Sequence, residues 1–420
     1  MTNTQPTARD ADVIIAGGGM TGLTLGLALA QAGLSVIVAD AVLASAQTAP
    51  TYDGRASAIA YASFRMWTAL GLADALSPHA QRIESILVTD GRVRGGASLL
   101  SLAFDRRELD AREDGEALGY MLENRHIRAA LGAAAARQPS LQLIAPVAVT
   151  GYAADAGGVT VLLADGRALR AGLVVGAEGR RSTIRETAGI RTTGWAYDQT
   201  AVVCTVAHQK PHDGVAHEYF LPSGPFAMLP LTQNRCNIVW TERPAIADAL
   251  RAMSDDDFMA ELRARFGDHL GAVTLAGPRF AYPLSLQIAE RWIDQRMVLI
   301  GDAAHGVHPI AGQGLNVGLR DVAALAECIV DGMRVGLDAG DGEMLTRYQR
   351  WRRFDTTSMA LVMDVFNRLF SNDLPVLRQL RGRGMAVVDA IGPARRFFMR
   401  EAAGGSGALP KLLKGEALAA

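Results

Sequence analysis

Residues 296–322 combine the groups that could bind an electron-rich ligand. They predict a short buried strand over 297–300, a tight acidic turn, a glycine-rich corner and then a helix. The first amides of such a helix lack partners within the helix and carry the positive end of its dipole, so they attract negative charge. Asp302 in the acidic turn can accept hydrogen bonds from sugar-like hydroxyls, and Gly312 and Gly314 allow the backbone to approach a flat ligand. These features favour a flavin.

The loop between the acidic turn and the glycine-rich corner carries His305, His308 and Pro309. The histidines are three residues apart, but the sequence has no third ligand close by and no HExxH motif. We therefore expect no metal and assign the histidines to structural or flavin-adjacent hydrogen bonds. One of them, or a chain of water molecules, could act as a base toward a substrate, and the sequence leaves that choice open.

A second glycine-rich motif lies near the N-terminus. The apolar run 12–16 leads into Gly17, Gly19 and Gly22, after which apolar residues recur at helical spacing. This GxGxxG pattern stands between a predicted strand and a predicted helix, which is the context in which it binds a dinucleotide pyrophosphate. Asp40 ends the next apolar run, about 20 residues past the glycines, where an acidic residue binds a ribose hydroxyl. The pattern predicts a nucleotide-binding βαβ unit.

Two further turns carry charged residues. Arg55 lies in a polar turn that we expect to lead into an apolar helix ending at Gly71. There its guanidinium can neutralise a pyrophosphate or lie against a cofactor ring; the alternative is an ordinary surface arginine. Glu178 and Gly179 follow the apolar run 173–176 and precede a short predicted helix, which repeats the order of strand, acidic turn and helix. A capped helix start is an equally compatible interpretation of this turn.

Composition narrows the class of protein. The chain has 420 residues, which favours about two domains, and a formal net charge of −1, which argues against nucleic-acid binding. Its three cysteines show no CxxC spacing and are expected to be free thiols. No apolar run approaches the ~20 residues of a membrane span and the N-terminus does not resemble a secretion signal. We therefore expect a cytoplasmic protein.

The region near the C-terminus is basic. Residues 343–400 contain eleven arginines and five acidic residues, in a predicted helical region. Apolar residues recur on one helical face between Met359 and Phe370, and we expect this stripe to pack in the core. The alternative is that the stripe and its arginine-rich flanks rest peripherally on an anionic inner-membrane surface. The Gly/Ser/Ala-rich tail, residues 401–420, is expected to be flexible, although Leu409, Leu412 and Leu413 could add a little apolar contact.

The three turns, in this order in one chain, resemble the fingerprints of FAD-dependent aromatic hydroxylases of the p-hydroxybenzoate hydroxylase class. The likeness spans nearly the whole chain. More narrowly, the chain resembles the ubiquinone-biosynthesis hydroxylases (2-polyprenyl-6-methoxyphenol hydroxylase-like), which act on polyprenylated phenols. The segments that carry this likeness are DGRASAIAYAS (53–63), FLPSGPFAMLPL (220–231) and GDAAHGVHPIAGQGLNVGLRD (301–321).

The resemblance implies an α/β fold, with a Rossmann-like FAD-binding domain, an inserted antiparallel β-sheet substrate domain and a C-terminal helical region. The expected boundaries are 1–75, 105–190 and 281–335 for the discontinuous FAD-binding domain, 76–104 and 191–280 for the substrate-binding sheet domain, and 336–400 for the helical region.

The resemblance also assigns residues to FAD. These are Gly17, Gly19 and Gly22 at the pyrophosphate, Asp40 at the adenosine ribose, Arg55 near the flavin, Asp302 at the ribityl or pyrophosphate region, Pro309, Gly312, Gly314 and Asn316 around the isoalloxazine ring, and Glu178 and Gly179 in the turn associated with FAD or pyridine nucleotide. The family usually has Asp-Gly at the middle turn, whereas this chain has the longer Glu178.

The implied reaction is hydroxylation of the aromatic ring of a polyprenylated phenol in ubiquinone biosynthesis. It uses FAD, NADH or NADPH, and O2, and proceeds through a flavin hydroperoxide. Two alternatives stay open: a hydroxylase of a small soluble aromatic compound, and a non-catalytic flavoprotein subunit of a quinone-biosynthesis complex. A charged substrate requires an Arg or Tyr cluster in the cavity, whereas a prenylated substrate requires an apolar channel. A flavin halogenase is disfavoured because the chain has no WxWxIP segment.

Overall fold

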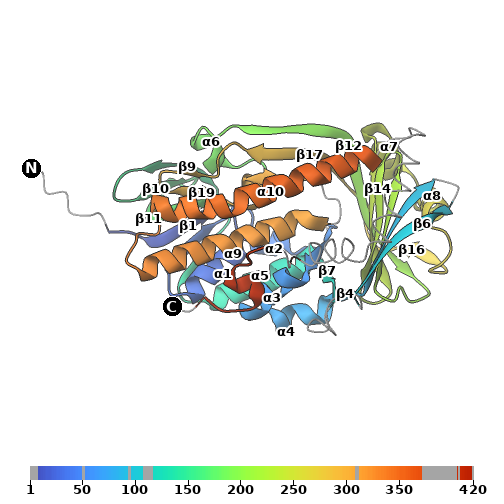
Figure 1. The fold of residues 1–420 in the computed structure, drawn as a ribbon, viewed down its shortest axis with the longest axis horizontal. Helices are drawn as coiled ribbons and strands as arrows, with labels where there is room; N and C mark the ends of the chain where they lie inside the picture. The colour runs from blue at the N-terminus through green and yellow to red at the C-terminus, as the bar shows by residue number, and fades with distance from the viewer. Residues whose placement is uncertain are drawn as a thin grey trace, which may run out of the picture.

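The computed structural model describes residues 8–49, 53–92, 96–106, 117–307, 312–370, 404 and 407–418. Two large sheets lie at opposite ends of an elongated molecule, with helices packed along the first of them (Figure 1). The chain also forms a third, smaller sheet of three strands. The predicted α/β class, with a Rossmann-like unit and a separate, largely antiparallel sheet, is confirmed. The exact domain boundaries stay a prediction.

The first large sheet has a parallel centre. β1 (Ala11–Ala16) pairs in parallel with β2 (Val36–Ala39) on one side and with β11 (Ala168–Gly176) on the other. β8 extends the parallel arrangement beyond β2, and β19 extends it beyond β11. The outer strands are β8 (Leu141–Ile144), β9 (Val149–Ala154), β10 (Val159–Leu163), β18 (Ile293–Asp294) and β19 (Met297–Leu299). The central strands are almost continuously apolar because parallel strands are usually buried on both faces.

Helices α1 (Met20–Gln31), α5 (Asn124–Arg137) and α9 (Gln313–Arg334) pack together beside this sheet. α1 approaches the strands closely at Gly26, where a Cβ atom would lie 3.0 Å from the Leu141 side chain and 3.1 Å from that of Val38. The short helices of this part are α2 (Ala44–Gln47), α3 (Tyr61–Ala69), α4 (Ala73–Leu76) and α6 (Thr183–Thr187).

The second large sheet has nine strands, in the order β20-β17-β12-β15-β14-β13-β5-β6 with β16 beside β12. All its pairs are antiparallel except β13 with β5. The strands are β5 (Ser85–Arg92), β6 (Gly96–Asp105), β12 (Thr192–His208), β13 (Val215–Leu221), β14 (Gly224–Leu231), β15 (Arg235–Glu242), β16 (Val273–Leu275), β17 (Phe280–Ala289) and β20 (His305–Gly306). α7 (Pro244–Ala252) and α8 (Asp255–Phe266) bury their apolar side chains against Phe226 and Trp240 on one face. The opposite face of the sheet is directed toward the nucleotide-binding part.

The small sheet consists of β3 (Ala56–Ala60), β7 (Gly119–Glu123) and β4 (Gln81–Ile83), all antiparallel. Its side chains Ala58 and Met121 pack against Leu229 and Leu231 of the second large sheet. Residues 56–60, which we expected to belong to the polar turn around Arg55, therefore form a strand, whereas the apolar helix expected to end near Gly71 is present as α3 (Tyr61–Ala69). The helix α3 begins only at Tyr61.

The C-terminal elements pack against the nucleotide-binding domain. α10 (Gly342–Phe370) packs along α9, and the short η6 (Lys411–Lys414) packs on α3. Leu412 and Leu413 are 1% and 0% exposed, and the Leu413 carbonyl accepts a hydrogen bond of 2.8 Å from Arg65. The expected flexible tail is therefore wrong for residues 407–418, because their leucines complete the main core. No helix of the described ranges is long and apolar enough to cross a membrane.

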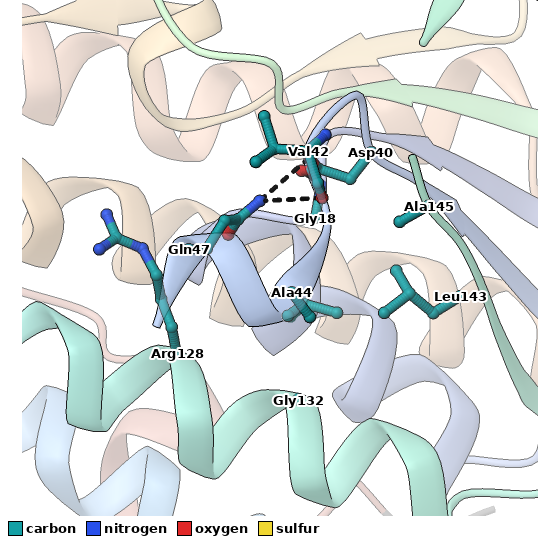
Figure 2. Close-up of a pocket in the computed structure, with 10 residues that line it drawn as sticks. Gly18, Asp40, Val42, Ala44, Gln47, Arg128, Gly132, Leu143 and Ala145 are labelled. Carbon is teal, nitrogen blue, oxygen red and sulfur yellow. Dashed lines mark hydrogen bonds between the residues drawn. The ribbon is translucent and has the colours of Figure 1, made fainter. Parts of the chain in front are cut away.

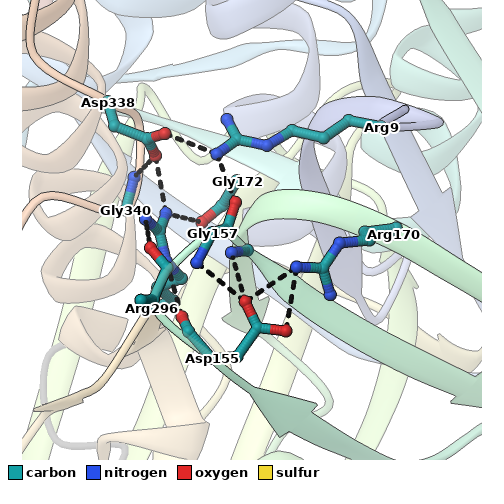
Figure 3. A network of polar contacts seen from close by, with 10 residues as sticks. Arg9, Asp155, Gly157, Arg170, Gly172, Arg296, Asp338 and Gly340 are labelled. Atoms are coloured by element: carbon teal, nitrogen blue, oxygen red, sulfur yellow. Dashed lines mark hydrogen bonds and ion pairs between the residues drawn. The ribbon is translucent and has the colours of Figure 1, made fainter. Parts of the chain in front are cut away.

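A polar network fixes the start of the segment 296–322 (Figure 3). Arg296 donates to the Gly172 carbonyl at 3.0 Å and to Asp338 at 2.7 Å. Arg9 reaches the other oxygen of Asp338 at 2.5 Å, and Asp155 pairs with Arg170. The network joins the start of β1, the β9–β10 hairpin, β11 and the connection between α9 and α10. The strand β19 is thereby held in place just before the acidic turn.

Candidate functional site

The predicted turns meet at one edge of the parallel sheet. Gly17 follows β1, Asp40 follows β2, Glu178 follows β11 and Asp302 follows β19. These four strands run parallel, so the turns after them share the carboxyl edge, where ligands bind in open α/β sheets. Residues spread over most of the sequence are thus brought to one site.

The three glycines of the N-terminal motif have different environments. A Cβ atom at Gly17 would lie 2.5 Å from the Ala177 carbonyl oxygen, and one at Gly22 would overlap the Gly17 carbonyl. A Cβ at Gly19 would meet no protein atom within 4 Å. Gly19 is also the N-cap of α1 and provides no side-chain cap. The helix start is therefore open to an anionic group, and this geometry fits a dinucleotide pyrophosphate.

Asp40 holds the loop beside that opening. Its carboxylate accepts hydrogen bonds from the backbone N–H groups of Gly18 at 2.6 Å and Val42 at 2.7 Å, and from the Gln47 amide at 3.0 Å. A small open pocket lies here, lined by Asp40, Gln47 and Arg128 of α5 (Figure 2). Its mixture of polar and apolar lining, and its place beside the open start of α1, suit the nucleoside half of a dinucleotide.

Arg55 is held by a carboxylate and an aromatic ring. Two hydrogen bonds, of 2.8 and 2.9 Å, join it to Asp53, and its guanidinium lies 4.7 Å from the centre of the Tyr282 ring. Asp53 also accepts hydrogen bonds from Arg128 at 2.8 Å and Asn124 at 3.1 Å. Burial by itself raises the pKa of Asp53, but Arg55 and Arg128 hold it well below its usual range. Asp53 therefore stays ionised and fixes the direction of both arginines.

Asp302 faces the same region from the other side. Its side chain is 47% exposed and lies 3.5 Å from Arg180, which follows the Glu178-Gly179 turn. Burial lowers the pKa of Arg55, but Asp53 and, more weakly, Tyr282 and Asp302 raise it above its ordinary value. Asp302 and Arg55 are therefore close enough to interact electrostatically across the same region. Because Asp302 is half exposed, its carboxylate can still accept hydrogen bonds from a ligand.

The carboxylate of Glu178 is used by hydrogen bonds within the protein. Its carboxylate accepts hydrogen bonds from Ser182 Oγ at 2.5 Å and from the backbone N–H groups of Thr183 at 3.2 Å and Ile184 at 3.3 Å. Burial raises the pKa of Glu178 in spite of these bonds. Glu178 thus satisfies the first amides of α6. The next residue, Gly179, has a φ of 84° and no atom near the position of a Cβ.

His305 lies in the interior. It is 1% exposed, and its Nε2 is bonded to Asp321 of α9. The other carboxylate oxygen of Asp321 accepts a hydrogen bond of 2.9 Å from Arg352 of α10. Burial alone raises the pKa of Asp321, but His305 and Arg352 hold it below its usual range. The structural interpretation of His305 agrees with these contacts, whereas His308 and Pro309 lie outside the described residues.

The start of α9 is pressed against β3. Gly312 has a φ of 64°, and a Cβ there would lie 3.0 Å from the Ala58 side chain. Asn316 accepts a hydrogen bond from Ala60 N at 2.9 Å and donates one to Ala58 O at 2.8 Å. Gly314 is less crowded, since its nearest contact would be Val307 at 3.9 Å. Asn316 therefore positions the strand that borders the helix N-terminus.

The second large sheet closes the site from the opposite side. Asn237 donates to the Gly54 carbonyl at 3.2 Å, and Tyr282 donates to Asp53 at 3.3 Å. The face that carries these two residues also carries an apolar cluster, which we call the apolar wall. It comprises Ala201, Val203 and Leu284, with Tyr197, Val239 and Tyr282 packed against them.

Sequence reasoning missed several residues of this arrangement. Asp53 stands in the DGR segment and Asp321 ends the GLRD segment, so both lay within motifs that were already recognised. Their partners, Arg128 and Arg352, lie on distant helices and have no local signal. Arg180 was adjacent to the middle turn and donates to the Val307 carbonyl at 3.1 Å. Only the tertiary fold joins these pairs.

Comparisons with known proteins agree with this geometry and confirm the resemblance. A family model described as FAD binding domain matches residues 10–359. Ubiquinone hydroxylase UbiL of Rhodospirillum rubrum is 48% identical over 394 residues, which cover 94% of this chain and 90% of that protein. The 3-demethoxyubiquinol 3-hydroxylase of Escherichia coli is 35% identical, with 96% of this chain and 100% of that protein covered.

The fold agrees with solved structures as well. The p-nitrophenol 4-monooxygenase PnpA of Pseudomonas putida superposes with a TM-score of 0.77 at 20% identity, and the match covers 94% of this chain and 99% of that one. From its family match, its relatives and the site at the sheet edge, the chain belongs to the FAD-binding ubiquinone hydroxylases and is an FAD-dependent monooxygenase.

Proposed function

We propose that this protein hydroxylates the aromatic ring of a polyprenylated phenol that is a precursor of ubiquinone, with O2 and either NADH or NADPH. The observation that carries the proposal is the apolar wall, which faces the nucleotide-binding part. A prenylated phenol needs such a surface for its hydrocarbon tail and ring. The names of the relatives from Rhodospirillum rubrum and Escherichia coli support the same substrate class.

The residues at the sheet edge fit FAD. The open helix start at Gly19 would hold the pyrophosphate, and the pocket of Asp40 and Arg128 would hold the adenosine half. Asp302 and Arg55 would lie along the flavin half, and Gly312 at the start of α9 would border the ring. When bound, the flavin supplies the redox chemistry that activates O2, and the protein supplies orientation and a dry site.

The surrounding residues keep the site rigid and dry. Asn316 fixes β3 against the start of α9, and Asp53 fixes Arg55 against Tyr282. On the far side, Ala360 and Met363 of α10 pack on Leu286 and Val307. This apolar packing would help to keep water away from a substrate at the apolar wall. Exclusion of water would favour oxygen transfer to the substrate, because it prevents side reactions with solvent.

The apolar wall also argues against a small aromatic acid as the substrate. An aromatic carboxylate needs a cation that is free to pair with it. Arg55, the arginine next to Tyr282 of the wall, already donates two hydrogen bonds to Asp53. Two of its N–H donors are therefore already used within the protein. A neutral phenol with a long apolar substituent matches this surface better.

An assay with the purified protein tests the proposal. The FAD-loaded protein is incubated with O2, NADH or NADPH and a phenol that carries a short prenyl chain, and the products are analysed by mass spectrometry. We expect a gain of one oxygen atom on the prenylated phenol and little product from 4-hydroxybenzoate. Preferential hydroxylation of the benzoate would contradict the substrate class. NAD(P)H oxidation without any hydroxylated product from either compound would support a non-catalytic role in a quinone-biosynthesis complex.

We further propose that α10 makes a peripheral contact with a membrane, within the basic region 343–400. Its outward face begins with the exposed residues Arg347, Arg350 and Arg353. It continues with exposed apolar side chains, namely Phe354 at 81%, Leu361 at 58%, Val362 at 51% and Val365 at 53%. Arginines at the headgroups and apolar side chains below them are the pattern of an interfacial helix.

Co-sedimentation with vesicles tests this contact. Vesicles that contain phosphatidylglycerol should retain the wild-type protein, and the double variant Phe354→Ser/Leu361→Ser should bind less. The matched control is Leu162→Ser, because Leu162 is 45% exposed on β10, outside α10. Equal binding of all three proteins would contradict a membrane role for α10.

A further inference from the structure

An acidic side chain, Glu218, lies on the sheet face that is directed toward the nucleotide-binding part. Side chains alternate along a strand. On β13, Tyr219 points into the core beneath α7 and α8, whereas Ala216 packs with Leu231 and Met121 on the other side. Glu218 is an even number of residues from Ala216 and therefore shares its face. The sheet thus presents one carboxyl group toward the site.

The strand register places Glu218 in line with the apolar wall. Glu218 pairs with Ala227 of β14, and Ala227 pairs with Val239 of β15. Val239 in turn pairs with Val203 of β12, and both valines belong to the wall. Paired residues of adjacent strands point to the same face. Glu218 is therefore the acidic member of an otherwise apolar row.

No hydrogen bond or ion pair joins the Glu218 carboxyl to another described residue. A carboxyl without a protein partner is unusual on an otherwise apolar face, because such a face solvates its charge poorly. Yet Glu218 is only partly buried by the protein itself, so a small group can reach it. Burial raises the pKa of Glu218 to about 7, which is where a general base works best at neutral pH.

The groups that face Glu218 from neighbouring strands are apolar. They are Ala227 on β14 and Val88 on β5. Asp90 on β5 pairs with Phe220, and the side chain of Asp90 lies outside the described residues. No other described charge alters the Glu218 pKa. The ionisation of Glu218 should therefore respond to a ligand that binds beside it.

We infer that Glu218 is the base that takes the proton of the substrate's phenol group. The phenolic O–H bond breaks, the proton bonds to a carboxylate oxygen of Glu218, and the electron pair stays on the phenolic oxygen. The resulting phenolate donates electron density into the ring and makes the attacked carbon more nucleophilic. After the ring carbon has gained its hydroxyl and lost its hydrogen as a proton, Glu218 returns its own proton to the phenolate oxygen. This inference rests on the proposed function, because it needs a phenol as the substrate.

Ionisation of a bound phenol gives a test that does not depend on turnover. The probe is 4-nitrophenol, whose phenolate absorbs visible light, bound to the FAD-loaded protein and titrated with pH. In the wild-type protein, two interacting groups share protons, so we expect a two-step curve. In Glu218→Gln the curve should collapse to one step. Identical curves for the two proteins would overturn the inference.

Turnover as a function of pH provides the second readout. With a prenylated phenol, the wild-type rate should fall as pH drops below about 7, because Glu218 becomes protonated. Glu218→Gln should lose about 10²-fold or more of the rate at pH 7 and should regain activity at alkaline pH, where solvent ionises the phenol. Glu218→Asp should retain part of the rate. A pH profile of Glu218→Gln that matches the wild type would contradict a role as base.

Two controls show whether the effect is specific to the Glu218 carboxyl. Asp248→Asn removes an exposed carboxylate from α7 of the same domain and should leave rate and pH profile unchanged. If Glu218→Gln and Glu218→Asp both lose bound FAD or circular-dichroism signal, Glu218 is structural and the inference fails. If instead the wild-type protein gives no hydroxylated phenol, the proposed function fails, and the nitrophenol titration still reports on Glu218.

Discussion

Asp321 of α9 accepts a hydrogen bond of 3.1 Å from the backbone N–H of Gly301, so the acidic turn is tied to the helix that follows it. The same carboxylate pairs with His305 and with Arg352 of α10. The acidic turn, α9 and α10 therefore meet at one buried anion beside the candidate site. The position of Asp302, the exposed neighbour of Gly301, depends on this buried group.

Replacing Asp321 with Asn should destabilise the protein by about 3–5 kcal/mol, because Arg352 is left buried without its full partner. The free energy of unfolding in urea measures the effect. The matched control is Asp294→Asn, whose ion pair with Arg291 is exposed and should cost only about 0–1 kcal/mol. Similar losses in the two variants would show that the buried group has no special role.

Glu123 should make stability fall in acid. Burial alone raises its pKa, but hydrogen bonds from His126 and Arg235 lower it to about 2. The folded-state pKa is thus below the unfolded value of about 4.3, so its stabilisation is complete above that pH and is lost as pH falls toward 2. The difference in unfolding free energy between wild type and Glu123→Gln should shrink from pH 6 to pH 3. A constant difference would contradict the lowered pKa.

Gly19→Ala and Gly22→Ala should have opposite consequences. A Cβ at Gly19 meets no protein atom, so the FAD-free protein should keep its stability while its affinity for FAD decreases. A Cβ at Gly22 overlaps the Gly17 carbonyl, so that variant should be destabilised even without FAD. Thermal unfolding with and without FAD, together with an FAD titration by fluorescence, distinguishes the two. Normal FAD affinity in Gly19→Ala would place the pyrophosphate elsewhere.

Glu178→Ala should reduce stability without weakening FAD binding. The variant loses the acceptor for the amides of Thr183 and Ile184, and helix caps contribute about 0.5–2 kcal/mol. Chemical denaturation measures the first effect, and an FAD titration measures the second. A large loss of FAD affinity at unchanged stability would favour the cofactor contact that the sequence motif implied for Glu178.

Leu413→Ala should cost about 2–5 kcal/mol, as expected for a fully buried leucine in a core. Its neighbour Lys414 is exposed, and Lys414→Ala should change the unfolding free energy by less than about 0.5 kcal/mol. Thermal denaturation of both variants provides the comparison. If Leu413→Ala unfolds like the wild type, the segment 407–418 is not part of the cooperative core.

Local patterns in the sequence were enough to predict the α/β fold and the four turns at the sheet edge. Parallel strands are marked by short apolar runs, and the acidic or glycine-rich residues directly after them must appear at their carboxyl ends. Gly17, Asp40 and Asp302 therefore lie where their local contexts predicted. The family likeness had the same origin, because its motifs are these turns.

Some conformations depend on residues far away in the sequence, and only the tertiary structure shows them. The alanine-rich residues 56–60 have helix-forming composition, yet Asn316 binds Ala58 and Ala60 through their backbone and holds them as a strand. Likewise, the tail composition indicated flexibility, but Leu412 and Leu413 are buried because a core space between α3 and α9 accepts them. Such effects depend on long-range contacts, for which no local pattern exists.

The same distinction holds for the site. The sequence identified Arg55 but not its fixed orientation, which needs Asp53 and Tyr282 from different parts of the chain. It drew attention to His305, which the fold buries against Asp321, and passed over Glu218, which strand register places beside the apolar wall. Residue type and spacing predicted FAD as the cofactor and a site for it at the edge of the parallel sheet. Only the packing of two sheets against each other determined which side chains face the substrate, because side-chain direction and burial are set by neighbours far away in the sequence.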